Sequence, residues 1–131
     1  MRSERGFSLA ELLMALLILT VVITMSLAAF IERNRRQQQA REIMLVYQAL
    51  ANESEYWRRI PFGELREDDR SFRSSTLPTL LDSVGQYEAI VTVTPATPTR
   101  KDVLLTIRWQ NRKREARLGI VRVDTGGSSL W

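Results

Sequence analysis

Twenty consecutive residues near the start of the chain, Leu12 to Ile31, contain no charged residue, no glycine and no proline. As a helix that rises about 1.5 Å per residue, this run is about 30 Å long, which matches the apolar core of a bilayer. Its polar members, Thr20, Thr24 and Ser26, can donate hydrogen bonds to carbonyls of their own helix. The run therefore predicts a membrane-spanning helix.

Two alternative interpretations of this run fit less well. A secretory signal peptide has an apolar core of only about 7–15 residues and then a small-residue cleavage site. Here the run is longer, and the charged segment Glu32–Arg36 follows it. A buried core helix would need protein on every side, and a chain of 131 residues is too short to provide it.

The helical pattern continues beyond the apolar run. No glycine or proline occurs from Phe7 to Ile60, and Pro61 then ends the pattern. We expect one helix of about 50 residues, continuous through residues 20–30, whose second half, residues 32–60, is amphipathic. Spacings of three and four predict its buried face: Ala40, Ile43, Met44, Tyr47, Leu50, Ala51 and Trp57.

The rest of the chain can cover that face. Three segments are rich in β-forming residues: 87–94, 103–110 and 116–123. The segments between them are typical of turns: 95–102 and 111–115. Alternation places four residues of the second strand on one apolar face: Val103, Leu105, Ile107 and Trp109. Residues 87–131 are thus expected to form an antiparallel β-sheet region with a C-terminal tail.

Residues 61–86 show little periodicity and are expected to be a connecting loop, with one helical turn that has Pro78 at its first position. The predicted fold class is α+β. A long amino-terminal helix, membrane-spanning in its first half, packs its second half on a small antiparallel β-sheet.

The composition argues against several kinds of chemistry. The chain has no cysteine and no histidine, so it lacks thiolate ligands, disulfides and the commonest general base. It has no glycine-rich phosphate loop and no serine in a nucleophile-type turn. We expect no enzymatic activity, no catalytic residue, no cofactor and no metal site. The acidic run Glu67–Asp69 lacks the flanking ligands of a calcium loop and is interpreted as a charged surface loop.

The first residues form a specific combination. A charged leader, "MRSERG", ends in glycine, "FSLAE" follows it, and the apolar run comes next. This combination resembles the type IV pilin family, which includes the pseudopilins of type II secretion. The resemblance implies that residues 1–6 are a prepilin leader and that a prepilin peptidase cuts between Gly6 and Phe7 and methylates the new amino terminus. Residues 7–31 would then be the transmembrane and assembly helix.

The same resemblance implies the function and the partners. The chain would be a minor pilin or pseudopilin that is assembled into, or initiates, a type IV pilus or a type II secretion pseudopilus. Its partners would be the prepilin peptidase, other pilin or pseudopilin subunits, an inner-membrane assembly platform and membrane lipid. The alternative is a non-polymerising, single-pass membrane-anchored protein with a small binding domain, which would not explain the leader or Glu11.

Glu11 would be the fifth residue of the cut chain. A carboxylate costs on the order of 2.5–3.5 kcal/mol at the centre of a bilayer and less near an interface, so it needs a partner. The new amino group of Phe7 lies four residues away on the same helix face, and the resemblance favours the amine of a neighbouring subunit. We hypothesise that this pair sets the register of assembly. The alternative is a tolerated interfacial acid.

Other features bear on the subclass. Many members of the family have proline where this chain has Ala28, and many major pilins close a C-terminal loop with a disulfide, which this chain cannot form. Both differences favour a minor pilin or pseudopilin. The segment "YEAIVTVTPATPTRKDVLLTIRWQ" is similar to the C-terminal region of V-type minor pilins and I-type minor pseudopilins. The presence of Glu11 argues against the K-type tip pseudopilin.

The charges that flank the span give a conflicting prediction of orientation. Arg2 and Arg5 precede the span, and more arginines follow it: Arg33, Arg35, Arg36 and Arg41. The positive-inside rule alone would place the C-terminal domain in the cytoplasm. The resemblance implies the opposite, because the peptidase must reach the Gly6–Phe7 bond from the cytoplasmic side. We expect an inner-membrane protein with a cytoplasmic leader and a periplasmic C-terminal domain.

Basic residues are concentrated near the last turn of the predicted sheet. Arg112, Lys113 and Arg114 lie near Trp109, and the formal net charge of the chain is +4. Cations beside an exposed aromatic ring would bind DNA through phosphates and stacking. The alternative, which we favour, is a solvated hairpin with Trp109 in the core beside Ile107.

Overall fold

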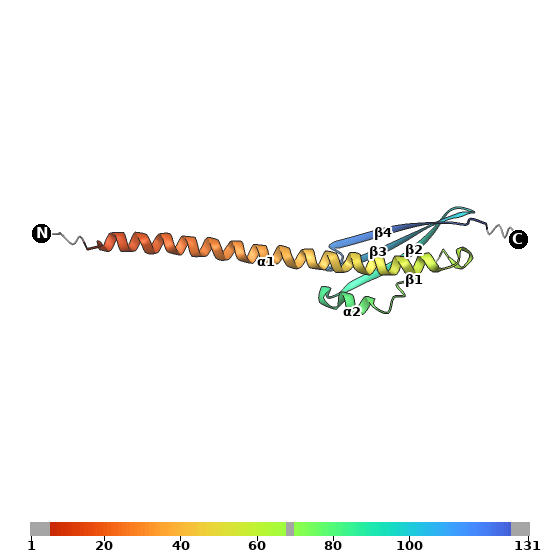
Figure 1. Ribbon diagram of the computed structural model, residues 1–131, viewed down its shortest axis with the longest axis horizontal. Helices are drawn as coiled ribbons and strands as arrows, with labels where there is room; N and C mark the ends of the chain where they lie inside the picture. The colour runs from red at the N-terminus through yellow and green to blue at the C-terminus, as the bar shows by residue number, and fades with distance from the viewer. Residues whose placement is uncertain (1–5, 68–69, 127–131) are drawn as a thin grey trace. The chain divides into compact units, whose positions relative to one another are not determined.

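The computed structural model describes residues 6–67 and 70–126 of the chain. The chain divides into two units, Met1–Ala40 and Arg41–Trp131. Helix α1, Leu9–Arg59, begins in the first unit and ends in the second (Figure 1). The prediction of one helix of about 50 residues is confirmed: α1 has 51 residues and is helical throughout residues 20–30. It ends shortly before Pro61, because proline cannot continue the backbone hydrogen bonding.

The segment expected to be a connecting loop contains several short elements. They are the 3-10 helix η1 (Phe62–Glu64), strand β1 (Arg70–Ser71), helix α2 (Leu77–Leu81) and the 3-10 helix η2 (Asp82–Val84). The predicted helical turn is present as α2, and Pro78 lies in its first turn. Strand β1 was not predicted. It has only two residues, so periodicity cannot reveal it, and it is defined by pairing with β2.

Three long strands form the rest of the sheet: β2 (Tyr87–Thr97), β3 (Arg100–Trp109) and β4 (Arg114–Val123). The sheet order is β1-β2-β3-β4, and every neighbouring pair is antiparallel. The three predicted strands are confirmed, but the predicted turns were too long. Strand pairing continues into the first of them, where Pro95 pairs with Lys101 next to an irregularity in the register. Proline is tolerated at such irregular positions.

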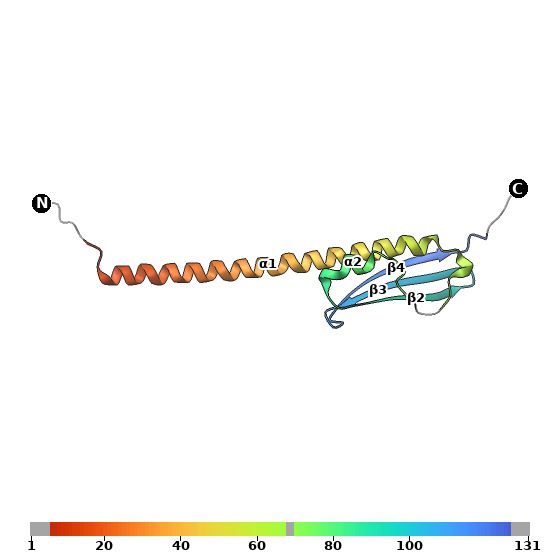
Figure 2. The same cartoon turned by 90° about the horizontal axis from the view of Figure 1, so that it is seen from below.

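The second half of α1 lies along one face of this sheet, with α2 beside it (Figures 1 and 2). The predicted apolar face of β3 is confirmed, since Val103, Leu105, Ile107 and Trp109 are all buried. The core also contains residues of the other strands, of α1 and of α2: Val46, Ala49, Leu50, Trp57, Leu65, Leu77, Leu81, Val91, Val93, Ala116 and Ile120. The predicted α+β fold class is therefore confirmed.

The predicted buried face of α1 was partly wrong. Of its members only Leu50 and Trp57 are buried, and Met44 and Tyr47 are exposed. The observed buried face is rotated around the helix: Val46, Ala49, Leu50, Glu53, Ser54 and Trp57. Residues 43–47 are all apolar and surround the helix, so their hydrophobicity does not define one face.

The rotation of the face follows from Glu53, a fully buried acid that the hydrophobic pattern did not place in the core. Its carboxylate accepts hydrogen bonds from Trp57 Nε1 at 2.8 Å, from the Arg73 backbone N–H at 2.8 Å and from the Ser74 backbone N–H at 2.9 Å. A buried carboxylate is tolerated when several donors surround it. Glu53 therefore joins α1 to the segment that precedes α2.

Two basic side chains fix the C-terminal end of α1. Arg122 of β4 donates to the carbonyl oxygens of Arg58 and Ile60, the latter at 2.8 Å. Lys101 of β3 donates to the carbonyl of Leu65 at 2.6 Å and lies over the ring of Phe62. The last carbonyls of a helix have no partner inside the helix, so the bond from Arg122 satisfies one of them, on Arg58. The bond from Lys101 holds the segment after α1, at the end of η1, against the sheet.

Candidate functional site

Ser8 and Glu11 define the start of helix α1. Gly6, Phe7 and Ser8 are not helical, and the Ser8 carbonyl accepts the first helical hydrogen bond, from the Leu12 N–H at 3.1 Å. Ser8 Oγ accepts from the Glu11 N–H at 3.2 Å, and Glu11 Oε2 accepts from the Ser8 N–H at 3.1 Å. This reciprocal pair is a capping box, which satisfies two amides that a helix start leaves unpaired.

The capping box changes the interpretation of Glu11. In the uncut chain the Phe7 nitrogen belongs to a peptide bond and cannot form an ion pair with Glu11. The Glu11 carboxylate accepts a hydrogen bond from the Ser8 N–H. A negative charge in the first turn is also favoured by the positive end of the helix dipole. The sequence reasoning missed Ser8, although a serine three residues before a glutamate at the head of an apolar run is the signature of this cap.

The apolar run is exposed throughout. Every described side chain from Gly6 to Gln38 is exposed, and among the described residues α1 is the one helix long and apolar enough to cross a membrane. The expected backbone bonds of two threonines are confirmed, because Thr20 donates to the Leu16 carbonyl at 2.8 Å and Thr24 to the Thr20 carbonyl at 2.9 Å. A helix with this surface and its hydroxyls already satisfied suits an apolar environment.

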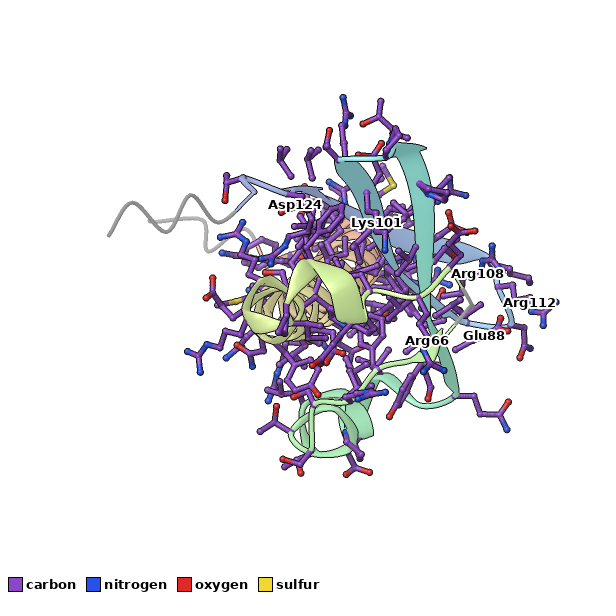
Figure 3. The ribbon with its side chains drawn as sticks, turned by 90° about the vertical axis from the view of Figure 1, so that its right-hand side faces the viewer. Arg66, Glu88, Lys101, Arg108, Arg112 and Asp124 are labelled. Atoms are coloured by element: carbon purple, nitrogen blue, oxygen red, sulfur yellow. The ribbon has the colours of Figure 1, made fainter. Side chains whose placement is uncertain are left out.

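Several of the basic residues around the sheet have acidic partners. Arg108 lies 2.7 Å from Glu115, which also pairs with Arg117, and Arg112 lies 3.1 Å from Glu88. Figure 3 shows Glu88, Arg108 and Arg112 close together. The hydrogen bond from Arg108, with a second from Arg117, lowers the pKa of Glu115 below its ordinary value. The same bond with Glu115 raises the pKa of Arg108.

The residues of the predicted nucleic-acid patch do not form one cationic face. Arg112 is paired with Glu88, Lys113 is exposed in the turn, and Arg114 lies on the sheet face turned towards α1, where side chains of β4 alternate inward. The Trp109 side chain is only 3% exposed and lies in the same core as Ile107. Its ring is therefore not accessible for stacking on a base.

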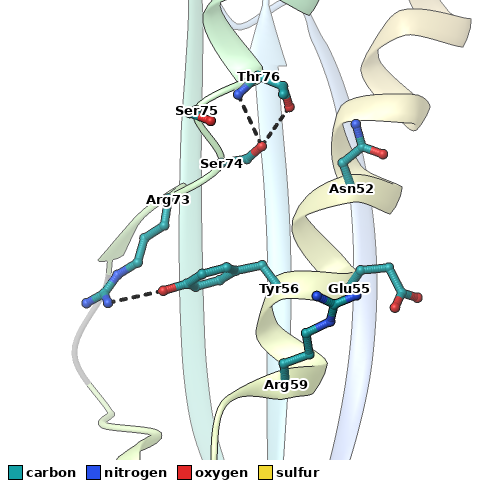
Figure 4. A pocket seen from close by; sticks show the side chains of 8 residues that line it. All are labelled: Asn52, Glu55, Tyr56, Arg59, Arg73, Ser74, Ser75 and Thr76. Carbon is teal, nitrogen blue, oxygen red and sulfur yellow. Dashed lines mark hydrogen bonds between the residues drawn. The ribbon is translucent and has the colours of Figure 1, made fainter.

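A polar hollow of about 530 Å³ lies between α1 and the segment before α2 (Figure 4). Arg73 Nη1 and Tyr56 Oη are 3.5 Å apart, and Ser74 Oγ and Thr76 Oγ1 are 2.7 Å apart. Within the described part of the chain, no three acidic, histidine or cysteine side chains are grouped for a metal ion. Of the acidic run interpreted as a surface loop, Asp68 and Asp69 lie outside the described residues, as do most of the leader and the end of the tail.

Comparison with known proteins gives one match. Residues 1–27 match the family described as the prokaryotic N-terminal methylation motif. No curated protein and no solved structure matches the chain. The match covers the leader, Gly6, Phe7, the capping box and the first part of the apolar run, all of which carried the resemblance noted in the sequence. The chain thus carries the prokaryotic N-terminal methylation motif, which is the leader signature of the type IV pilins and pseudopilins.

Proposed function

We propose that this protein is a minor pilin or pseudopilin, a structural rather than catalytic subunit. A prepilin peptidase removes residues 1–6 by cutting at the Gly6–Phe7 bond and methylates the amino group of Phe7. The processed subunit is assembled into, or initiates, a type IV pilus or a type II secretion pseudopilus. The observation that carries this proposal is the methylation motif at residues 1–27, which runs into a helix whose apolar side chains are exposed.

Before assembly the apolar half of α1 crosses the inner membrane, with the leader in the cytoplasm and the sheet domain in the periplasm. When the helix leaves the bilayer, its apolar side chains must be buried against other subunits, because exposing this apolar surface to water costs free energy. The large exposed area supports assembly: Leu12, Met14, Leu17, Met25 and Phe30 are all more than half exposed.

Glu11 sets the register of assembly in this proposal. Its carboxylate accepts a hydrogen bond from the Ser8 N–H through Oε2, and an ionised carboxylate has room for further donors. Cutting at Gly6 creates an ammonium group on Phe7, and the Phe7 ammonium of a neighbouring subunit can pair with Glu11. In apolar surroundings, any other axial offset between the two helices leaves both the carboxylate and the ammonium group unpaired. The charge pair therefore favours one register.

The test is an intact-mass measurement of the full chain expressed with and without a prepilin peptidase. We expect loss of Met1–Gly6 and gain of one methyl group only when the peptidase is present. A Gly6→Val variant is the matched control and should remain uncut. A Cβ at Gly6 meets no atom within 4 Å, so that failure would not reflect a clash inside the chain. If the wild-type chain remains uncut both with and without the peptidase, the result would instead support the alternative, a non-polymerising membrane-anchored protein with a small binding domain.

A further inference from the structure

One face of α1 in the sheet domain remains uncovered. The Ile43 side chain is 40% exposed, Tyr47 54% and Met44 71%, although all three were expected to pack against the sheet. They lie three and four residues apart and therefore form one continuous apolar strip. Large apolar side chains grouped in this way are typical of a surface that binds another molecule.

A hollow of about 400 Å³ adjoins this strip. Its walls come from α1 and from the hairpin of β3 and β4: Ile43, Tyr47, Trp109, Lys113, Arg114, Glu115 and Ala116. Gln110 Nε2 donates to Glu42 Oε2 at 3.0 Å, and this bond fastens the hairpin turn to α1 beside the hollow. One side of the hollow is thus apolar and the other is basic.

Two buried hydrogen-bond donors in these walls have no acceptor. Trp109 and Arg114 are directly opposite each other in the register of β3 and β4, so their side chains are neighbours on the face turned towards α1. The Trp109 Nε1 and Arg114 Nη1 atoms are both buried, and neither has a hydrogen-bond partner among the described residues. Buried donors are nearly always paired in native proteins, so two neighbouring exceptions call for an acceptor from outside.

The charges of the hollow specify the acceptor. Lys113 and Arg114 are cationic, and the one acid in the walls, Glu115, has both carboxylate oxygens bonded to Arg108 and Arg117. An incoming carboxylate would therefore find two cations, and the neighbouring acids Glu115 and Glu42 already accept hydrogen bonds, Glu42 from Gln110. The long Arg114 side chain can turn its guanidinium towards the hollow, where it forms charge-assisted hydrogen bonds.

We propose that the apolar strip and the hollow together bind a segment of a partner protein in which an acidic side chain stands beside an apolar one. The carboxylate accepts hydrogen bonds from Lys113 and from Arg114 after its guanidinium turns towards the hollow, and the apolar side chain packs on Met44 and Tyr47. The buried Trp109 indole, which neighbours Arg114, senses this movement without contacting the partner. Nucleic acid is the less suitable occupant, because the strip is apolar and the Trp109 ring is covered. This binding depends neither on processing at Gly6 nor on Glu11, so it can be tested independently of the proposed function.

The test uses the full chain, labelled with ¹⁵N, in nanodiscs of zwitterionic lipid. The probes are two acetylated tripeptide amides, Leu-Asp-Leu and Leu-Asn-Leu, which differ only in the charge. The measured quantity is the chemical shift of the Trp109 indole N–H, assigned with a Trp109→Phe variant. We expect a saturable shift with the aspartate peptide only. The indole of Trp57, already bonded to Glu53, is the internal reference and should not move.

Variants locate the binding. Arg114→Gln should weaken binding of the aspartate peptide about tenfold or more, because a charge-assisted hydrogen bond is lost. Arg100→Gln is the matched control, because Arg100 lies at the opposite end of β3 from Trp109 and does not line the hollow, and it should leave the affinity unchanged. If Arg114→Gln does not fold, Lys113→Gln in the exposed turn serves in its place and should weaken binding several-fold.

Four results would overturn the proposal. They are an equal response to both peptides, no response to either, a shift on concentrating the protein without peptide, or a shift on replacing the lipid by an anionic one. The third would identify a second copy of the chain as the occupant, and the fourth would identify the membrane surface.

Discussion

A glutamate near each end of helix α1 accepts hydrogen bonds from backbone amides, but the two side chains have different surroundings. Glu53 is buried, and three N–H donors occupy both of its carboxylate oxygens, two of them on residues that follow it by about twenty positions. Glu11 accepts one N–H from Ser8, in its own helical turn, where every described side chain is exposed. Glu53 is thus used within the subunit, whereas Glu11 keeps capacity for a partner. The difference separates an acid that maintains the fold from one that we propose to act in assembly.

The largest expected effect is on stability at Glu53. Glu53→Ala leaves one buried donor, on Trp57, and two half-buried backbone donors without an acceptor, and we expect the free energy of unfolding of the sheet domain to fall by about 3 kcal/mol. Denaturant titration of the solubilised chain, followed by tryptophan fluorescence, measures it. Glu55→Ala, two residues away on the exposed side of the helix, should change stability by less than about 0.5 kcal/mol. Equal losses in both variants would contradict the assigned role of Glu53.

Glu11→Ala should give the opposite result. It leaves the stability of the sheet domain unchanged, but we expect incorporation into filaments to fall by about tenfold or more, because the register-setting charge pair is lost. Incorporation is measured by quantifying the subunit in sheared filaments. Glu32→Ala, which removes the acid paired with Arg36 on the same helix, should assemble normally. Normal incorporation of Glu11→Ala would leave Glu11 as a helix cap only.

Ser8→Ala sharpens this distinction between capping and assembly. It removes the side-chain acceptor for the Glu11 N–H but keeps the carboxylate, so the helix start should lose about 1 kcal/mol. Amide hydrogen exchange of residues 9–12 in nanodiscs should become faster, whereas exchange near Glu53 stays unchanged. Unchanged exchange at the helix start would mean that the capping box contributes little.

The smallest expected effect concerns a third acid, Glu115, whose pKa is lowered by its bond with Arg108. A lowered folded-state pKa contributes stability above the ordinary pKa of a glutamate, and this stability is lost as the pH falls through the folded-state pKa. The wild-type domain should therefore lose slightly more stability than Glu115→Gln between neutral and acidic pH. Thermal melts of both proteins across that range provide the measurement, and parallel curves would contradict the prediction.

The sequence predicted those features that depend on strong local patterns. The apolar run, the continuous helix to Arg59 and the inward face of β3 were visible as uninterrupted hydrophobicity, absence of breakers and alternation. The buried face of α1 could not be derived in this way, because residues 43–47 are apolar on all sides. The face is fixed by Glu53, whose donors Arg73 and Ser74 are distant in sequence.

The residues of the candidate sites likewise divide into those that a local sequence pattern reveals and those that depend on the tertiary structure. Gly6, Phe7 and Glu11 were found from a short contiguous motif, and Ser8 could have been found from the capping-box spacing. The partners of the basic residues were not predictable, since the pairing of Arg112 with Glu88 depends on which strands are neighbours. The two donors without an acceptor, on Trp109 and Arg114, appear only once the register of β3 and β4 is known.

The place where α1 begins has a consequence for how the chain is presented to a protease. Proteases bind their substrates in extended form, and a bond inside a helix must first be unwound. Because Ser8 caps the helix and Leu9 is its first residue, Gly6 and Phe7 lie outside it. The Gly6–Phe7 bond is therefore available without melting any part of a helix that continues for 51 residues. In the proposed processing, the cap would therefore separate the segment that is removed from the helix that remains.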